Sequence, residues 1–366
     1  MPPNMRSHLR KVVTVVVLAL LTAGVPRAQT PAGAPDARTL RVGVAAADPL
    51  EIARILAARY PAQPIMSYIP ALTWSSQLRL GLIPPDGKWR DKAMKDIQLL
   101  TSGQIPAIAE PYRLTSLAGA LALADAATLA GDKAAGELAK KIAAFINDDA
   151  GNPPVKFTAG WTDDMFMASA VLSRVTPGAY GDTVYRLLTS YATKLQRPDG
   201  LFIHAENGPH AWGRGNGFAL LGVTEALTHL GAWAGRKEVL GIYRKHVAAL
   251  AKHQSDDGSW RQVIDESTSY RELTVTAMIT AALARGIAND WIDPKVYEPI
   301  MNRGWQAVAA RVNPDGTVRD VCSGTGAGPT KEYYLNRPVV NGADDRGGAM
   351  ALLAAVEMRL LKNRSH

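Results

Sequence analysis

The chain has 366 residues, of which 47% are hydrophobic and 20% are charged, a composition that excludes a disordered protein. Its formal net charge is +8, but the basic residues form no run of the kind that follows a nucleic-acid backbone, so we expect no nucleic-acid partner.

The segment 1–28 is typical of a secretory signal peptide. A basic start is followed by an apolar run at 12–25, too short for a comfortable membrane span, and by small residues near Ala28. The alternative is a buried or membrane-anchoring helix. Cleavage would lower the formal net charge from +8 to +4, because it removes four basic residues, Arg6, Arg10, Lys11 and Arg27.

The next segment, 29–40, is rich in alanine and proline and predicts a linker, which leaves 41–366 as a single folded domain. We expect a periplasmic or secreted monomer with no membrane contact once the signal is removed. Cys322 is the one cysteine, so a large core must hold the fold together without an intramolecular disulfide. The sequence has no CxxC, HExxH or clustered His/Cys spacing, so we expect no metal site.

Three turns in the second half of the chain share an Asp-Gly pair and a fixed spacing. They read RPDGLFIH, SDDGSWRQ and NPDGTVRD, and the interval from Gly200 to Gly258 equals the interval from Gly258 to Gly316. A fixed period of this size indicates a repeated supersecondary unit.

The segments around these turns have apolar residues three and four positions apart, which predicts helices. In each unit the helix before the turn has a polar face, whereas the helix after it is rich in Ala, Leu, Gly and Thr and suits an inner layer. The expected outer helices are 182–196, 237–254 and 294–312, and the expected inner helices are 215–231, 272–287 and 344–361.

The same period fits about six times into the chain that follows position 28. The first two inner helices would then lie in 73–82 and 111–132. Six helical hairpins that close on themselves form an (α/α)6 barrel, and closure removes the exposed ends of an open array. We therefore expect an all-α domain of this type.

Charged and aromatic residues gather in the segments that lead into the inner helices. Since loops on a rigid scaffold commonly carry binding and catalytic residues, we expect these segments to meet at one mouth of the barrel and to form a site there. The segments are 160–167, 201–218, 259–272 and 321–348.

Asp163 and Asp164 stand side by side between Trp161 and Phe166. Neighbouring helix positions point about 100° apart, so only one of the two carboxylates is expected to face the site. The simpler interpretation is a helix cap, because acidic side chains satisfy the free N–H groups of a first turn. The simpler interpretation of Trp161 and Trp212 is that they are core residues.

Arg214 lies among small residues in the stretch AWGRGNGF. The glycines suit either close helix packing or the approach of a ligand, and GRGNG lacks the GxGxxG spacing and the preceding strand of a dinucleotide site. An arginine in this setting, next to Trp212, predicts an anionic partner.

Four stretches occur in order between about residues 110 and 360: GWTDDMFM, AWGRGNGFALLG, GSWRQVIDESTSYRELTVTAMITAALARGI and VCSGTGAG…YYLNRP…DDRGGAMALLAAVE. Together they resemble glycoside hydrolase family 105, the unsaturated rhamnogalacturonyl hydrolases, which are related to the unsaturated glucuronyl hydrolases. The resemblance implies an (α/α)6 barrel without a metal or organic cofactor. It implies a substrate made by polysaccharide lyases, an oligosaccharide with a 4,5-unsaturated uronic acid at its non-reducing end.

By this resemblance Asp163 is the catalytic residue, with Asp164, Phe166 and Phe218 as possible support. Many relatives have tryptophan at the place of Phe218. The family has a second acidic residue on the preceding inner helix, for which this chain offers only Glu110. The implied substrate-binding residues are Trp161, His204, Trp212, Arg214, Asn216 and Glu110.

The chemistry implied is hydration of the C4=C5 double bond, in which one residue donates a proton and later accepts one from water. The usual pair of carboxylates flanking a glycosidic bond is then not required. Two other interpretations stay open: another carbohydrate enzyme on the same barrel, an inverting glycosidase or a polysaccharide lyase, and a non-catalytic sugar-binding relative.

Overall fold

A computed structural model describes residues 47–176 and 178–364, which belong to one structural unit. The predicted signal peptide at 1–28 and the predicted linker at 29–40 lie outside these residues, so both stay predictions. Within the described ranges, none of the helices combines the length and apolar character needed to cross a membrane.

The described residues form mainly helices, together with two short antiparallel sheets. The helices are α1 (Pro49–Arg59), α2 (Tyr68–Leu80), α3 (Gly87–Thr101), α4 (Leu114–Leu117), α5 (Ala120–Ala130), α6 (Lys133–Ile146), α7 (Thr162–Leu172), α8 (Gly181–Leu195), α9 (Gly213–His229), α10 (Arg236–Ala251), α11 (Leu273–Ala288), α12 (Pro294–Ala309), α13 (Lys331–Leu335) and α14 (Asp345–Arg364). The strands are β1 (Trp260–Arg261), β2 (Arg271–Glu272), β3 (Val318–Cys322) and β4 (Val339–Gly342), which pair as β1–β2 and β3–β4.

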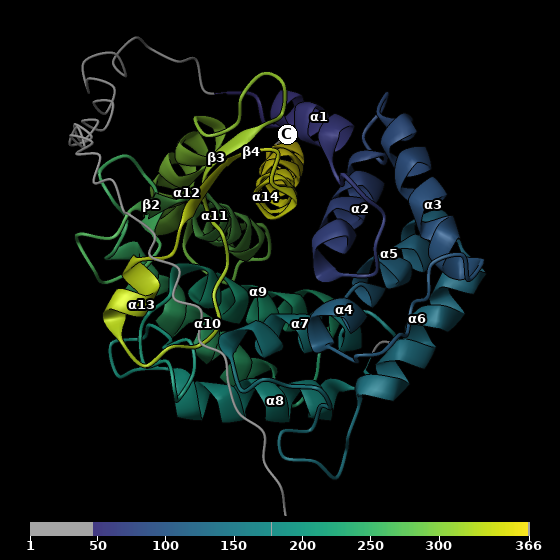
Figure 1. The fold of residues 1–366 in the computed structure, drawn as a ribbon, viewed down its shortest axis with the longest axis horizontal. Coiled ribbons are helices and arrows are strands. Elements are labelled where there is room, and N and C mark those ends of the chain that lie inside the picture. The colour runs from purple at the N-terminus through teal and green to yellow at the C-terminus, as the bar shows by residue number, and fades with distance from the viewer. Residues whose placement is uncertain (1–46, 177, 365–366) are drawn as a thin grey trace, which may run out of the picture. The chain divides into compact units, whose positions relative to one another are not determined.

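Six helices form an inner ring, in the order α2, α5, α7, α9, α11 and α14 (Figure 1). Each packs against the next, and α14 packs against α2, which closes the ring. Six further helices, α3, α6, α8, α10, α12 and α1, surround them. The predicted (α/α)6 barrel is thereby confirmed, and the inner helices expected in 73–82 and 111–132 correspond to α2 and α5.

Five of the six helical hairpins consist of an inner helix and the outer helix that follows it in the chain. The sixth is different, because the inner helix α14 packs against α1, which comes from the other end of the described chain. The barrel is therefore closed by contacts between two segments that are distant in sequence.

The three Asp-Gly turns show the same circular order. Their glycines have φ angles of 99°, 86° and 80°, a left-handed conformation that favours glycine. Each glycine lies close to the next outer helix of the ring: Gly200 approaches Lys245 of α10, Gly258 approaches Arg303 of α12, and Gly316 approaches Arg59 of α1. The helix α1 thus occupies the position that the repeat assigns to the next outer helix after α12.

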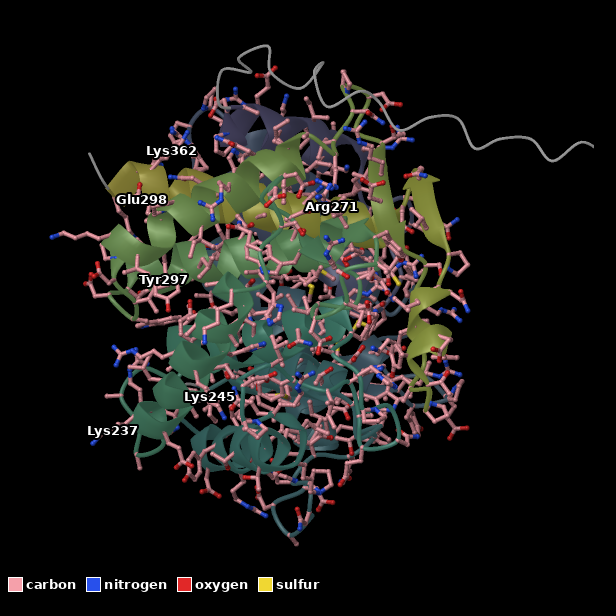
Figure 2. All side chains as sticks on the ribbon, turned by 90° about the vertical axis from the view of Figure 1, so that its left-hand side faces the viewer. Lys237, Lys245, Arg271, Tyr297, Glu298 and Lys362 are labelled. Carbon is pink, nitrogen blue, oxygen red and sulfur yellow. The ribbon has the colours of Figure 1, made fainter. Side chains whose placement is uncertain are left out.

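The two layers differ in how they meet water. The inner helices α9 and α11 are buried over most of their length, as their apolar and small residues predict. The outer helices bury one face only and carry charged side chains on the other, such as Lys237 and Lys245 of α10 and Glu298 of α12 (Figure 2).

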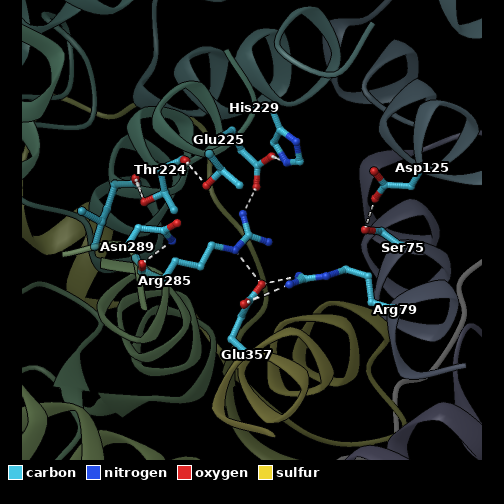
Figure 3. A network of polar contacts seen from close by, with 12 residues as sticks. Ser75, Arg79, Asp125, Thr224, Glu225, His229, Arg285, Asn289 and Glu357 are labelled. Atoms are coloured by element: carbon cyan, nitrogen blue, oxygen red, sulfur yellow. Dashed lines mark hydrogen bonds and ion pairs between the residues drawn. The ribbon is translucent and has the colours of Figure 1, made fainter. Parts of the chain in front are cut away.

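A chain of alternating charges links all six inner helices toward their carboxyl ends, and Figure 3 shows part of it. Arg285 lies between two carboxylates, at 2.7 Å from Glu225 and 2.6 Å from Glu357. Arg79 also pairs with Glu357, and Arg174 pairs with Glu225 and, at 3.0 Å, with Asp125. In ring order the chain runs through Asp125 (α5), Arg174 (just after α7), Glu225 (α9), Arg285 (α11), Glu357 (α14) and Arg79 (α2).

Candidate active site

The segments that lead into the inner helices are joined to one another at the mouth of the barrel. The Thr162 amide donates to the His204 carbonyl at 2.9 Å, which joins the start of α7 to the segment before α9. The Gly213 amide donates to the Gln262 carbonyl at 2.6 Å. The Cys322 amide donates to the Glu272 carboxylate at 2.9 Å, so all four predicted segments meet in one place.

Asp163 and Asp164, at the first turn of α7, have different surroundings. The Asp163 side chain is 17% exposed, and its Oδ2 lies 3.3 Å from His204 Nε2. Asp164 is buried, and its Oδ2 accepts the backbone N–H groups of Ala159, Gly160 and Trp161. The helix-cap interpretation therefore applies to Asp164, and Asp163 is the carboxylate that faces the site.

Burial raises the pKa of Asp164 to about 6, although the Tyr191 hydroxyl, which donates to it at 2.8 Å, lowers that pKa. The charge of Asp163 adds to the rise. Asp164 thus holds the first turn of α7 from inside the protein.

His204 is fully buried and is held by Tyr334. Its Nδ1 lies 2.9 Å from the Tyr334 hydroxyl, which also accepts the Gly328 N–H at 3.2 Å. Because a buried hydroxyl proton needs an acceptor, we assign that proton to Nδ1 of a neutral imidazole, which places the ring proton on Nε2, toward Asp163. Within the described residues, Asp163 Oδ2 and His204 Nε2 are both buried and form no aligned hydrogen bond, although they lie 3.3 Å from each other.

Two tryptophans enclose His204. The Trp161 ring lies 5.2 Å from the imidazole, and the buried Trp212 ring lies 4.5 Å from it. Trp212 also packs under the Arg214 guanidinium, at 5.1 Å. Trp161 is only partly buried, so of the two tryptophans predicted to bind substrate it is the one with surface left for a ligand.

Arg214 is buried, in the first turn of α9. Its Nη1 donates to the Cys322 carbonyl at 2.9 Å and lies 3.4 Å from the Thr274 hydroxyl. Within the described part of the chain it forms no ion pair, which agrees with the expectation of an anionic partner from outside the protein.

Asn216 has no polar group left for a sugar. Its Oδ1 accepts from the Phe202 amide and lies 3.1 Å from His246 Nε2, and its Nδ2 donates to the carbonyls of Phe202 and Trp212. The side chain therefore fixes the segment before α9 in place. Its predicted contact with substrate is not supported by this geometry, because every hydrogen-bonding position is taken.

The predicted supporting residues Phe166 and Phe218 lie in the core, where their rings stack at 5.8 Å. Glu110 is exposed in the segment before α4. Among the residues that the structure describes, it forms no hydrogen bond or ion pair with any other predicted site residue.

Sequence reasoning missed Tyr334, Tyr68 and Arg346. Tyr334 lies in the predicted stretch YYLNRP, but its contact with His204 joins residues that are 130 positions apart. Tyr68 lies at the start of α2, outside every predicted motif, and its ring packs edge-on against Phe218 at 5.6 Å. Its position could have indicated a role in the site, because Asp163 and Arg214 also lie in the first turn of an inner helix.

In the described ranges, no group of three or more His, Cys, Asp or Glu side chains is arranged to hold a metal ion. The site as described offers a carboxylate, an imidazole, a guanidinium and aromatic surface, a set suited to proton transfer on an anionic sugar.

A family profile matches most of the barrel in sequence, and known proteins match about half of this chain. The sequence profile described as Glycosyl Hydrolase Family 88 matches residues 63–362. An unsaturated 3S-rhamnoglycuronyl hydrolase of Alteromonas sp. (strain LOR) is 28% identical over 218 residues, which cover 54% of this chain and 50% of that protein. An unsaturated rhamnogalacturonyl hydrolase of Bacillus subtilis is 26% identical over 191 residues, which cover 49% and 54%. The match therefore spans about half the length of these curated relatives.

Solved structures share the fold. A glycoside hydrolase of family 105 from C. acetobutylicum has a TM-score of 0.74 at 18% identity and covers 84% of this chain and 99% of that one. The unsaturated glucuronyl hydrolase of Bacillus sp. GL1 has a TM-score of 0.64 at 11% identity, with coverages of 85% and 95%. The predicted kinship with unsaturated rhamnogalacturonyl and glucuronyl hydrolases is confirmed, and since the profile match takes in most of the barrel, the chain belongs to Glycosyl Hydrolase Family 88.

Proposed function

We propose that this protein hydrolyses oligosaccharides that carry a 4,5-unsaturated uronic acid at the non-reducing end. The observation that carries the proposal is the pair formed by Asp163 and His204 at the mouth of the barrel, with Oδ2 and Nε2 3.3 Å apart and both without an aligned partner. Membership of the family and the names of the relatives support the same substrate class.

Asp163 donates its proton to C4 of the unsaturated ring. The positive charge that forms at C5 is shared with the ring oxygen, because the double bond is an enol ether. Water then adds at C5 and gives up a proton to the Asp163 carboxylate. The resulting hemiketal opens, and the neighbouring sugar leaves with its own oxygen.

His204 holds Asp163 in position for both proton transfers. Tyr334 fixes the tautomer of the imidazole, so that the ring proton lies on Nε2, the nitrogen that is 3.3 Å from the Asp163 carboxylate. A donor at this place stabilises the carboxylate that remains after the first transfer. Arg214 binds the uronate carboxylate, and Trp161 stacks against a sugar ring.

The test follows the absorbance of the conjugated double bond in disaccharides that lyases release from several acidic polysaccharides. We expect the wild-type protein to remove this absorbance and release the second sugar, and Asp163→Asn to do neither. A polysaccharide lyase would instead create the absorbance from an intact polysaccharide. An inverting glycosidase would cleave saturated substrates without changing it, and a sugar-binding protein would leave it constant.

Lyase products arise where polysaccharides are degraded, and export would bring the protein to them. We therefore place its action in the periplasm or outside the cell, on the strength of the signal peptide predicted at 1–28. Action as a monomer stays part of the proposal.

A further inference from the structure

Arg214 is a buried cation that lacks a carboxylate partner in the described chain. Its side chain is linked to Glu272 only through the Thr274 hydroxyl. The Glu272 carboxylate is itself engaged by the Val275 and Cys322 amides. A buried charge without a counter-ion is costly, so the structure leaves room for one anionic group from a ligand.

A second guanidinium lies close to the first. Arg346, in the first turn of α14, donates from Nη2 to Asp344 at 2.8 Å and from Nη1 to the Ser323 carbonyl. A Cβ built on Gly324 would meet two heavy atoms within 4 Å, Arg346 Nη1 at 3.0 Å and Arg214 Nη2 at 3.5 Å. Both nitrogens therefore lie within 3.5 Å of a single point, next to a glycine that has no side chain to occupy it.

Both guanidinium groups belong to the same site as the proposed acid. Burial raises the pKa of Tyr68 to about 12. The charges of Arg214 and Arg346 lower this pKa, and those of Asp163 and Asp344 raise it. The charges of these groups therefore all act on the Tyr68 hydroxyl. The loop that carries Gly324 also passes Trp161, since a Cβ on Gly326 would lie 3.7 Å from the Trp161 ring.

We infer that Arg346 and Arg214 hold the carboxylate of the unsaturated uronate together, beside Gly324. A carboxylate placed beside Gly324 can accept one N–H from each group, at about 2.8 Å, because both nitrogens border the same point. Arg346 is then a determinant of specificity for the acid, and this inference rests on the proposed function.

The experiment uses one unsaturated disaccharide in two forms, with its uronate as the free acid or as the methyl ester. The ester keeps the double bond and removes the negative charge. We expect Arg346→Gln to lower kcat/KM for the acid by roughly tenfold or more, mainly through KM, because a charge-assisted hydrogen bond is lost. The value for the ester should stay within about twofold of wild type, so the preference for the acid falls.

A merely structural role of Arg346, through its bond to the Ser323 carbonyl, predicts a different result. The matched control is Arg337→Gln, because Arg337 Nε donates to the Gly324 carbonyl at 2.9 Å and holds the same loop. Loosening the loop in this way should affect acid and ester alike. Arg346→Lys keeps the charge and serves as a second variant where Arg346→Gln melts too low to assay, and it should retain part of the preference.

The possible results separate the inference from the proposed function. A wild-type protein that consumes the acid, together with an Arg346 variant that loses the acid preference, supports both. Equal losses on acid and ester, or no loss on either, would overturn the role of Arg346 and leave the proposed function standing. A wild-type protein that leaves the double bond intact in every substrate would overturn both.

Discussion

Replacement by asparagine should mainly lower turnover at Asp163 and mainly lower stability at Asp164. Asp163→Asn removes a titratable proton from a partly exposed side chain, so we expect turnover to fall at least about 100-fold while the melting temperature stays near that of wild type. Asp164→Asn removes the charged acceptor of three backbone N–H groups. It should cost about 1–3 kcal/mol of unfolding free energy.

Both variants are checked by turnover on an unsaturated disaccharide and by thermal melting. Near-normal turnover in Asp163→Asn, combined with a large loss in a stably folded Asp164→Asn, would transfer the catalytic role to the buried neighbour.

The raised pKa of Asp164 predicts a pH dependence of stability. Since its folded pKa of about 6 exceeds the ordinary value of 3.8, the folded protein retains a proton that the unfolded chain has released between these pH values. The stabilisation is complete below about pH 4 and is lost as the pH rises through 6. We expect the unfolding free energy of wild type, relative to Asp164→Asn, to fall by on the order of 3 kcal/mol between pH 4 and 7.

Urea unfolding at a series of pH values measures this difference directly. A difference that stays constant or grows with pH would mean that Asp164 is ionised in the folded protein across the whole range.

Replacement of Arg214 by lysine tests its contact with the substrate. Lysine keeps the charge, but its single ammonium cannot reproduce a guanidinium that donates to the Cys322 carbonyl from one nitrogen and to the substrate from the other, so we expect the Michaelis constant to rise several-fold. Arg214 donates to a carbonyl and a hydroxyl and forms no ion pair in the described residues. The melting temperature of the Arg214→Lys variant should therefore fall only slightly. A sharply lower melting temperature with an unchanged Michaelis constant would make this arginine structural.

At this scale the sequence predicted residue types better than their roles. Asp163, His204 and Arg214 were found because a local motif carries each of them. Asn216 lies in the same motif, yet its amide is used up inside the protein. Arg346 escaped prediction because its significance comes from Gly324, which lies earlier in the chain and outside its helix.

Among the helices, the chain of alternating charges is the feature that predicts the largest loss of stability. Arg285→Met would leave the carboxylates of Glu225 and Glu357 each without one partner. Breaking a buried pair from one side costs about 3–5 kcal/mol. We expect that loss in urea unfolding, with kcat/KM at low temperature unchanged, because Arg285 lies at the carboxyl end of α11, away from the mouth.

The matched control is Lys140→Met on the outer helix α6. Lys140 pairs with Glu137 at 2.8 Å, but both side chains are more than half exposed. Exposed pairs contribute about 0–1 kcal/mol, so this variant should melt close to wild type. Equal losses in the two variants would remove any special role from the buried chain.

Helix positions followed well from apolar spacing and from the constant period of the Asp-Gly turns. The charge chain did not, because Arg79, Arg174 and Arg285 look like ordinary polar residues near helix ends. The packing of neighbouring inner helices brings Arg174 and Arg285 beside their carboxylates. Ring closure brings Arg79 beside Glu357, 278 positions away. Contacts of that kind depend on the whole barrel, and no local pattern encodes them.

For the molecule as a whole, the signal peptide prediction leads to a direct measurement. The mature protein should begin near Gln29 and be recovered outside the cytoplasm, because a signal peptide of the kind predicted at 1–28 directs export and is then removed. Mass spectrometry of the protein purified from its native source determines its first residue. Retention of Met1 or of the apolar run would show that no cleavage takes place.

The pairing of α1 with α14 sets a lower limit on the time at which the barrel can close. The end of α1 and the start of α14, Arg59 and Asp345, lie near opposite ends of the described chain. At the usual pace of about 5–20 residues per second, a ribosome needs about 15 to 60 seconds to proceed from the first of these positions to the second. Throughout this interval the packing partner of α1 does not yet exist, so the ring closes late in synthesis or after it, however early the single hairpins form.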